Sequence, residues 1–332
     1  MKKLINLPEQ VVKEMLAGME AAYPDYIRLL PELNVVVRTD APIQGQVGLV
    51  SGGGSGHEPT HGGFVGKGML SAACAGDVFT SPTPDQILAA IKEVDGGAGV
   101  LLVIKNYTGD VMNFEMAAEL AAAENIETAS VVVDDDVAVE DSLYTQGRRG
   151  IAGTVFVHKI TGAKAEAGGT LAEVQAVANK VIANVRSMGM ALTPCIVPAA
   201  GKPTFTLAED EVEIGMGIHG EPGTHREKIR PADEITKHLT DKVLIDLPFN
   251  EGDEVAVMIN GLGATPLMEL FILNKKVAAM LAERNIKVFR TYVGEYMTSL
   301  EMAGASVTLL KLDEELKDLL AAPADTPGFK QL

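Results

Sequence analysis

Short runs of apolar residues alternate with amphipathic stretches along the first half of the chain. Strands are expected at 46–50, 99–104 and 129–133, where small and β-branched apolar residues run together. Helices are expected at 84–94, which follows a capping threonine and begins with proline, and at 112–125, which is rich in alanine and glutamate. This alternation predicts a mostly parallel sheet covered by helices on both faces.

The pattern changes after the middle of the chain. We expect a long helix at 171–189, with Gly189 at its carboxyl end. The three prolines of 193–205 indicate a linker, which we take as the boundary between two domains. The remaining elements make a second α/β unit, with strands expected at 212–220, 254–260, 286–293 and 306–312 and a helix at 267–285.

These elements predict an α/β protein built from two α/β domains. The first, at 1–190, is expected to be a three-layer sandwich around a mostly parallel sheet and to carry a glycine-rich loop. The second, at 191–332, is expected to be smaller, and its C-terminal segment packs either within it or back on the first domain. With 332 residues, the chain is long enough for each domain to bury its own core.

Charge and cysteine content exclude several classes of protein. The formal net charge of −17 argues against a general binder of nucleic acid or of anionic membranes, because these partners require a basic surface. Cys74 and Cys195 stand far apart, so neither a disulfide framework nor a zinc site is indicated. Apolar runs such as 99–104 are far shorter than the roughly 20 residues of a membrane helix, and the N-terminus lacks a signal-peptide pattern. We expect a cytoplasmic protein.

The sequence "SGGGSGHEP" at 51–59 follows the first expected strand and resembles several ligand-binding loops without matching them. Both the dinucleotide pattern G-x-G-x-x-G and the nucleophile elbow G-x-S-x-G fail at His57. Near Lys67, a Walker-like pattern fails at His61 and Gly68, so this chain is not expected to bind ATP on its own. His57 remains, either as a functional histidine at the carboxyl end of a parallel strand or as a histidine that caps a turn.

Two further segments carry polar residues in positions suited to chemistry. His219 lies in "GMGIHGEPG" at 215–223, where neighbouring glycines let a small ligand reach an imidazole that can act as nucleophile or base. Lys105 ends the second expected strand, and Asp110 lies in the turn before the next helix. Asp110 can accept a proton from a hydroxyl or orient a histidine, and the alternative is a helix N-cap.

Other charged residues give weaker signals. Asp134 to Asp136 are expected to form a solvated strand end, since their spacing does not match a calcium site. The arginines of "QGRRG" at 146–150 could receive an anion or an acidic partner. We assign no function to the remaining histidines, and His61 is taken as structural; the others are His158, His225 and His238.

Several segments, in the same order along the chain, resemble the substrate-binding K subunits of bacterial dihydroxyacetone kinases driven by the phosphoenolpyruvate phosphotransferase system. They extend from about residue 46 to residue 312 and include "SGGGSGHEP", "FTSPTPDQI", "IKNYTGD", "VVVDDDVAVEDSLYTQGRRG", "VPAAGKPTFTLA", "GMGIHGEPG" and "LGATPLMEL". The region at 226–252 is shorter than in better-known members.

The resemblance implies roles for the residues singled out above. His219 would hold the ketone carbon of dihydroxyacetone as a covalent hemiaminal, which selects carbonyl compounds over polyols. His57 and Asp110 would assist proton transfer, with Asp110 as base for the terminal hydroxyl. The remaining substrate hydrogen bonds would come from Gly54, Ser55, Gly56 and Lys105.

The resemblance also implies partners. No cofactor or metal is expected on this chain, because ADP or ATP with Mg²⁺ would be bound by a separate L subunit that an M subunit recharges. The chain ends soon after residue 320, which leaves no room for a fused nucleotide domain and favours the multi-subunit form. A homodimer is expected. The alternatives are a dihydroxyacetone-sensing regulator that acts with a transcription factor and, less favoured, a nucleotide-dependent oxidoreductase.

Overall fold

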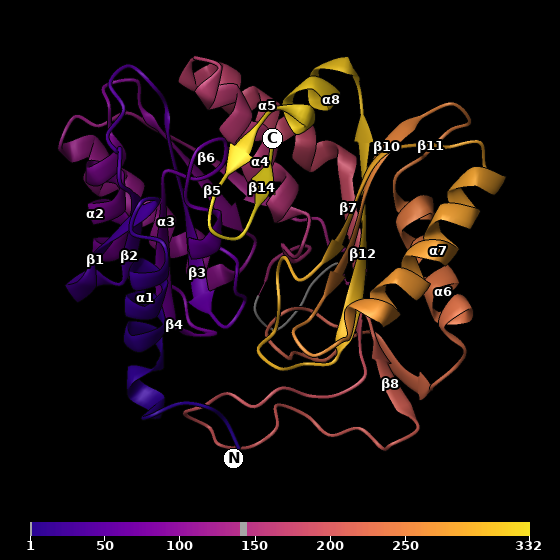
Figure 1. The fold of residues 1–332 in the computed structure, drawn as a ribbon. Helices are drawn as coiled ribbons and strands as arrows, with labels where there is room; N and C mark the ends of the chain where they lie inside the picture. Colours follow the sequence, from indigo (N-terminus) through magenta and orange to yellow (C-terminus); the bar gives the residue numbers. More distant parts are fainter. Residues whose placement is uncertain (1, 140–144) are drawn as a thin grey trace.

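Two sheets of six strands each organise the chain in the computed structural model, which describes residues 2–139 and 145–332 (Figure 1). The first sheet has the strand order β1-β2-β4-β3-β5-β6. Its strands are β1 (Ile27–Leu30), β2 (Val35–Arg38), β3 (Gly48–Ser55), β4 (Ala72–Val78), β5 (Val100–Lys105) and β6 (Thr128–Val133). The four strands from β4 to β6 run parallel, whereas β1 and β2 form an antiparallel edge.

The second sheet has the order β11-β10-β12-β7-β8-β9, and within it only β10 and β11 pair in parallel. Its strands are β7 (Val185–Ala191), β8 (Glu211–Ile214), β9 (His225–Lys228), β10 (Glu254–Gly261), β11 (Lys287–Gly294) and β12 (Gly304–Leu312). A short hairpin of β13 (Ala324–Asp325) and β14 (Lys330–Gln331) ends the chain.

Helices cover both sheets and also fill the space between them (Figure 1). In the first half they are α1 (Val11–Ala22), α2 (Pro84–Val94), α3 (Thr108–Ala123), α4 (Thr154–Glu166) and α5 (Leu171–Asn184). In the second half they are α6 (Ala232–Asp246), α7 (Leu267–Glu283) and α8 (Glu314–Ala321). The 3₁₀ turns are Pro8–Gln10, Pro31–Leu33 and Gly62–Phe64. None of the helices within 2–139 and 145–332 is long and apolar enough to cross a membrane.

Local chemistry explains how α2 begins. The backbone N–H of Thr83 donates to the side chain of Gln86, and the N–H of Gln86 donates to the Thr83 hydroxyl. This capping box, with Pro84 in the first turn, satisfies backbone groups that a helix start leaves without partners.

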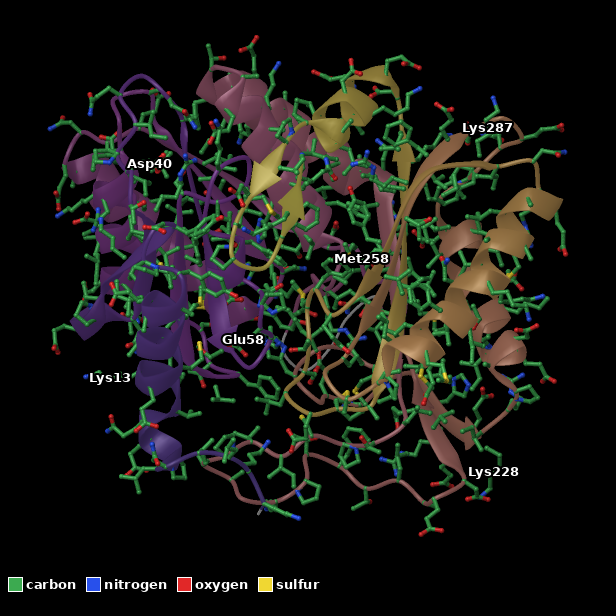
Figure 2. All side chains as sticks on the ribbon, viewed as in Figure 1. Lys13, Asp40, Glu58, Lys228, Met258 and Lys287 are labelled. Carbon is green, nitrogen blue, oxygen red and sulfur yellow. The ribbon has the colours of Figure 1, made fainter. Side chains whose placement is uncertain are left out.

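Three apolar layers hold the molecule together. The outer face of the first sheet packs on α2 and α3, and the outer face of the second sheet packs on α6 and α7. The largest layer lies between the sheets, where α4, α5 and α8 contribute side chains such as Phe156 and Leu316 that pack with residues of both. Figure 2 shows Met258 of β10 in this interior and Lys13, Lys228 and Lys287 at the periphery. The expected α/β class and the sandwich around the first sheet are confirmed.

The C-terminal segment returns to the first sheet's side of the molecule. Asp325 forms a β-bridge with Lys67, and the N–H of Gly328 donates to the carbonyl of Gly63 at 2.7 Å. Phe329 is buried in the layer between the sheets.

The helix expected at 171–189 is too long. It ends at Asn184, and β7 then pairs with β12 on one side and β8 on the other, so the second sheet begins at Val185, inside the range assigned to the first domain. Gly189 is a strand residue rather than a helix end. A Cβ there would lie 2.7 Å from the Met216 carbonyl oxygen, which explains the glycine by close backbone approach.

Two further expectations about the second half need correction. The proline-rich segment at 193–205 joins β7 to β8 within one sheet and is not a linker between domains. The strand expected at 212–220 ends at Ile214, because Gly215 adopts a left-handed backbone with φ of 77°. Residues 215–223 are therefore a loop, and this loop carries His219.

The glycine run at 52–54 is part of strand β3, not a loop after it. Each glycine occurs where another group leaves no room for a side chain. A Cβ on Gly52 would lie 2.6 Å from the Cys74 carbonyl oxygen, one on Gly53 would lie 2.6 Å from Lys105 Nζ, and one on Gly54 would lie 2.5 Å from the Thr80 nitrogen. The glycines thus allow close packing of β3 against its neighbours rather than backbone flexibility.

Candidate active site

A cavity of about 560 Å³ opens where the first sheet faces the loop after β8. It lies beyond the carboxyl ends of β3 and β5, the edge at which open α/β sheets place their ligands. The lining residues come from both halves of the chain and are Gly54, Phe79, Ser81, Tyr107, Thr108, Gly109, Asp110, Thr204, His219, Gly220, Glu221 and Pro222.

The two histidines singled out from the sequence, 162 positions apart, meet beside this cavity. His57 Nε2 lies 3.1 Å from His219 Nε2, and His57 Nδ1 lies 2.8 Å from the carbonyl oxygen of Thr298. A carbonyl only accepts hydrogen bonds, so His57 carries its proton on Nδ1 and presents a lone pair on Nε2. His219 Nε2 must then be the donor in the contact between the rings.

Backbone contacts fix His57 against the second half of the chain. The N–H of Thr298 donates to the His57 carbonyl at 3.1 Å, and the N–H of Leu300 donates to the Gly56 carbonyl at 2.7 Å. The segment before β12 therefore holds the end of β3 directly. The distance between the two imidazoles depends on this junction of the two sheets.

Desolvation favours the uncharged form of both imidazoles, of which His57 is fully buried and His219 half-buried at the cavity wall. Desolvation, with a smaller effect from the Lys105 charge, lowers the pKa of His57 from 6.5 to about 3. Desolvation likewise lowers the pKa of His219 well below 6.5, aided by His57, Lys105 and Arg149. A neutral imidazole has the free lone pair that nucleophilic or base chemistry requires.

Aromatic rings surround His219 and restrict its orientation. The Tyr107 ring meets it edge-on at a centroid distance of 4.4 Å, and the Phe79 ring does so at 5.3 Å. Phe79 also stacks on His57 at 5.2 Å with an interplanar angle of 17°. These ring contacts hold the two imidazoles at a fixed angle.

Lys105 and Asp110 form a second polar pair. Lys105 ends β5, Asp110 lies in the first turn of α3, and their Nζ and Oδ2 atoms are 3.7 Å apart. Both side chains are buried, and among the described residues neither Lys105 Nζ nor Asp110 Oδ1 has a hydrogen-bond partner. Two unsatisfied polar atoms in one buried place indicate a position for a polar group of a ligand.

Electrostatics favour Asp110 as a base rather than as a helix cap. Tyr107 is the N-cap of α3, so the N-cap interpretation of Asp110 is wrong. Burial raises the pKa of the Asp110 carboxyl, although Lys105 and the Ser81 hydroxyl act in the opposite direction. Burial also lowers the pKa of the Lys105 ammonium. A carboxylate with a raised pKa is a stronger proton acceptor.

The substrate contacts expected of the glycine segment are divided in the structure. Gly54 lines the cavity, whereas Ser55 and Gly56 are not among its lining residues. The Ser55 hydroxyl donates to the Gly76 carbonyl at 2.7 Å, and the N–H of Gly56 donates to the Glu58 carboxylate at 3.1 Å. Substrate contacts by Ser55 and Gly56 stay predictions.

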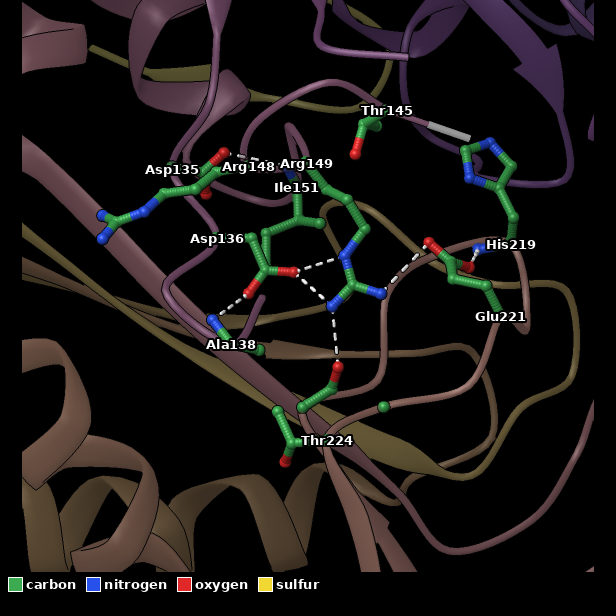
Figure 3. A network of polar contacts seen from close by, with 12 residues as sticks. Asp135, Asp136, Ala138, Thr145, Arg148, Arg149, Ile151, His219, Glu221 and Thr224 are labelled. Carbon is green, nitrogen blue, oxygen red and sulfur yellow. Dashed lines mark hydrogen bonds and ion pairs between the residues drawn. The ribbon is translucent and has the colours of Figure 1, made fainter. Parts of the chain in front are cut away.

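A network of buried charges lies directly behind His219, and the sequence reasoning missed it (Figure 3). Asp135 and Asp136 are both 0% exposed, so a solvated strand end was the wrong interpretation for them; of the three aspartates only Asp134 is exposed. Arg149 of the "QGRRG" segment is also 0% exposed and so cannot receive an external partner. The sequence did contain a signal for this network, because the aspartates at 134–136 and the arginines of "QGRRG" at 146–150 have opposite charges and lie close in sequence.

The network combines hydrogen bonds with one longer ion pair, in which Arg149 Nη1 and Glu221 Oε1 make no hydrogen bond among the described residues. Arg149 donates to Asp136 Oδ2 from Nε at 2.7 Å, and its Nη2 donates to the Gly215 carbonyl at 2.7 Å. Its Nη1 lies 3.5 Å from Glu221 Oε1. The Asp135 carboxylate accepts hydrogen bonds from the N–H groups of Ile151 and Gly153, just before α4. Residues 140–144, which lie between the aspartates and Arg149 in the sequence, are outside the described residues.

His61 belongs to a different buried cluster. Its Nδ1 lies 3.0 Å from His158 Nε2 and 3.3 Å from the Ser51 hydroxyl. Neither histidine is among the lining residues of the cavity. In the described parts of the chain, no three histidine, cysteine or acidic side chains are arranged to hold a metal ion.

Comparison with known proteins relates this chain to one family. A family model described as the Dak1 domain matches residues 17–328. The dihydroxyacetone-binding subunit of a PTS-dependent dihydroxyacetone kinase from Listeria innocua is 56% identical over 327 residues, which cover 98% of this chain and 99% of that subunit.

Two solved structures are similar over almost the whole chain. The dihydroxyacetone kinase of C. freundii superposes with a TM-score of 0.88 at 37% identity, covering 99% of this chain and 60% of the kinase chain. A co-activator of a dihydroxyacetone kinase operon superposes with a TM-score of 0.90 at 37% identity, covering 96% of this chain and 98% of the co-activator.

Proposed function

The chain belongs to the Dak1 family of dihydroxyacetone kinases, and from this membership we propose that it is the dihydroxyacetone-binding subunit of a phosphoenolpyruvate-dependent kinase. In this proposal it holds the ketone covalently on His219 and presents it for phosphorylation to dihydroxyacetone phosphate. The observation that carries the proposal is the contact between two neutral imidazoles near Lys105 Nζ and Asp110 Oδ1, two buried atoms that have no hydrogen-bond partner within the described residues.

The covalent step is a nucleophilic addition. As the N–H bond of His219 Nε2 breaks, its electron pair bonds to the carbonyl carbon, the carbon–oxygen double bond becomes single, and the displaced electron pair moves onto oxygen. The proton on His219 Nε2 passes to His57 Nε2, which lies 3.1 Å away with a free lone pair. His57 then gives a proton to the new oxyanion, so the hemiaminal forms without net gain or loss of protons. The low pKa of His57 makes its protonated form a strong acid for this step.

The second polar pair handles the hydroxyl that is to be phosphorylated. Lys105 Nζ can donate a hydrogen bond to the hydroxyl oxygen, and Asp110 Oδ1 can accept its proton. As the hydroxyl oxygen bonds to phosphorus, its proton moves to the Asp110 carboxylate. Covalent attachment of the neighbouring carbon keeps the nucleophilic oxygen in one place. The substrate therefore loses its translational and rotational entropy when it is captured, and not during phosphoryl transfer.

The phosphoryl donor belongs to a partner. We assign ADP or ATP with Mg²⁺ to a separate L subunit, recharged through an M subunit by phosphoenolpyruvate. The similarity to Listeria innocua's kinase subunit over 98% of this chain supports this arrangement. We also place the protein in the cytoplasm as a homodimer.

Reconstitution tests the proposal and separates it from a regulatory function. The similarity to an operon co-activator favours a sensor as the second candidate. A sensor requires the capturing His219, but not the proton-handling His57 and Asp110. With L and M subunits and phosphoenolpyruvate, we expect dihydroxyacetone phosphate to form at a rate comparable to that of the Listeria subunit. Covalent binding of dihydroxyacetone without turnover would instead identify a sensor.

The neutral state of the two histidines predicts how they respond to pH. An exposed histidine titrates near pH 6.5. Because burial disfavours the charged form, His57 and His219 should remain neutral as the pH falls from 8 to 5. In an NMR titration of the folded protein, their ring proton signals should move by less than a tenth of the shift of a free histidine. A midpoint near pH 6.5 for either ring would contradict the buried, neutral pair.

A further inference from the structure

We propose that Glu221 is a positioning residue that holds the backbone of His219 in the orientation needed for covalent capture, and that Arg149 and Asp136 fix Glu221 in turn. The inference rests on the proposed function and adds the device that aligns its nucleophile. Glu221 Oε2 accepts a hydrogen bond from the backbone N–H of His219 at 2.8 Å (Figure 3).

The loop that carries His219 needs such a device. Glycines flank the histidine at positions 217 and 220, and Gly220 has a left-handed φ of 72°. A loop of this composition has many accessible conformations, whereas addition to a carbonyl requires the attacking nitrogen to approach from one direction. The hydrogen bond from His219 N–H to Glu221 closes the loop around the nucleophile.

On its other side the Glu221 carboxylate faces the Arg149 guanidinium as an ion pair, without a hydrogen bond between them in the described part of the chain. Glu221 is 5% exposed, and its Oε1 lies 3.5 Å from Arg149 Nη1. The same guanidinium donates to the carbonyl of Gly215, so Arg149 contacts the loop both before and after His219. Asp136 holds Arg149 from behind with two short contacts, 2.7 Å from Nε and 2.6 Å from Nη2.

Gly217 provides the space that this arrangement needs. A Cβ at Gly217 would lie 2.1 Å from Glu221 Oε1 and 2.9 Å from Arg149 Nη1. A side chain there would displace the carboxylate without changing any charged residue. Gly217 therefore offers a second way to test the contact.

Charge balance indicates that Glu221 can be replaced without unfolding the protein. Asp136 and Glu221 together carry two negative charges against one positive charge on Arg149. Replacement of Glu221 leaves Arg149 paired with Asp136, so no uncompensated cation remains buried. The contribution of Glu221 is then measurable in folded variants.

Two substitutions of Glu221 separate the effect of its side-chain length from the effect of its charge. Glu221→Asp keeps the charge but withdraws the carboxylate by one methylene, which breaks the bond to His219 N–H. Glu221→Gln keeps the length and an accepting oxygen but removes the charge. We expect Glu221→Asp to weaken adduct formation about 10- to 100-fold, the range for a lost hydrogen bond to a charged group, and Glu221→Gln to weaken it less, about three- to tenfold, because its one amide oxygen can still accept from His219 N–H while the ion pair with Arg149 is lost.

Glu213→Asp is the matched control. Glu213 is 4% exposed, its Oε1 accepts from the N–H of Gly223 at 2.9 Å, and its Oε2 pairs with Arg226 Nε at 2.8 Å. It therefore makes the same kinds of contact with the same loop, but not with His219. We expect its adduct constant to stay within about threefold of wild type.

The measurement is a titration with dihydroxyacetone labelled with ¹³C at its carbonyl carbon, in which the NMR signal of the hemiaminal carbon reports the adduct, alongside thermal unfolding of each variant. Gly217→Ala should reproduce the loss seen in Glu221→Asp. Equal adduct constants in Glu221→Asp and Glu213→Asp, or an equal loss in Glu221→Gln, would overturn the positioning while the proposed function stands. A wild-type chain without an adduct would overturn the proposed function and this inference together.

Discussion

Replacement of His219 by alanine is expected to abolish the covalent adduct with dihydroxyacetone. The methyl group of alanine offers no nucleophile, and His57 is not among the residues that line the cavity. Without the covalent bond the substrate loses its fixed orientation, so turnover with the partner subunits should fall at least about 100-fold. The adduct is measured by NMR of carbonyl-labelled substrate, and turnover by formation of dihydroxyacetone phosphate.

His225→Ala provides the comparison for this variant. His225 lies on β9 with an exposed side chain, and it is not among the lining residues of the cavity. The His225→Ala variant should form the adduct and turn over substrate as the wild type does. If His219→Ala still gave the hemiaminal carbon signal, the covalent attachment would belong to another residue and the proposed mechanism would be wrong.

Replacement of Asp110 by asparagine should separate capture from phosphoryl transfer. Asparagine has the same shape but cannot accept the proton of the substrate hydroxyl, so turnover is expected to fall roughly 100- to 10,000-fold. Capture depends on the two imidazoles, so the adduct should persist, with its dissociation constant changed by less than about tenfold. Single-turnover measurements with the phosphorylated partner would isolate the affected step.

Asp85→Asn is a suitable control for Asp110→Asn. Asp85 also lies in the first turn of a helix, α2, and it is exposed and outside the cavity. The Asp85→Asn variant loses the same favourable interaction between a carboxylate and the helix dipole, but residue 85 does not contact the proposed substrate position. Near-normal turnover in Asp110→Asn would exclude Asp110 as the base, and an equal loss in both variants would point to a helix effect.

Three strands of the first sheet, β3, β5 and β6, could be predicted because they carry strong local signals, whereas β1, β2 and β4 were not predicted. Strands β5 and β6 lie within one or two residues of the expected ranges, as does α2 with its capping threonine and proline. Four candidate site residues were also singled out from the sequence, namely His57, Lys105, Asp110 and His219. Each stands at the end of a strand or next to glycines, and the fold brings them together around one cavity or directly beside it.

The remaining features depend on partners distant in sequence. Gly52 to Gly54 have the composition of a loop, and only the approach of Cys74, Lys105 and Thr80 explains why they form a strand. Adjacent aspartates normally remain hydrated, so the run of aspartates alone does not predict that Asp135 and Asp136 are buried. Their burial becomes favourable only once Arg149 and the N–H groups before α4 are folded against them.

The helical layer shared by the two sheets has a consequence for evolution and engineering. Phe156 of α4 and Leu316 of α8 belong to one apolar cluster with residues of both sheets, so neither half has a complete interior of its own. The chain therefore cannot be divided into exchangeable modules, as dinucleotide-binding and substrate-binding domains often can. A recombined protein that combined the His57 half of one relative with the His219 half of another would have to preserve this shared packing before its two histidines could meet.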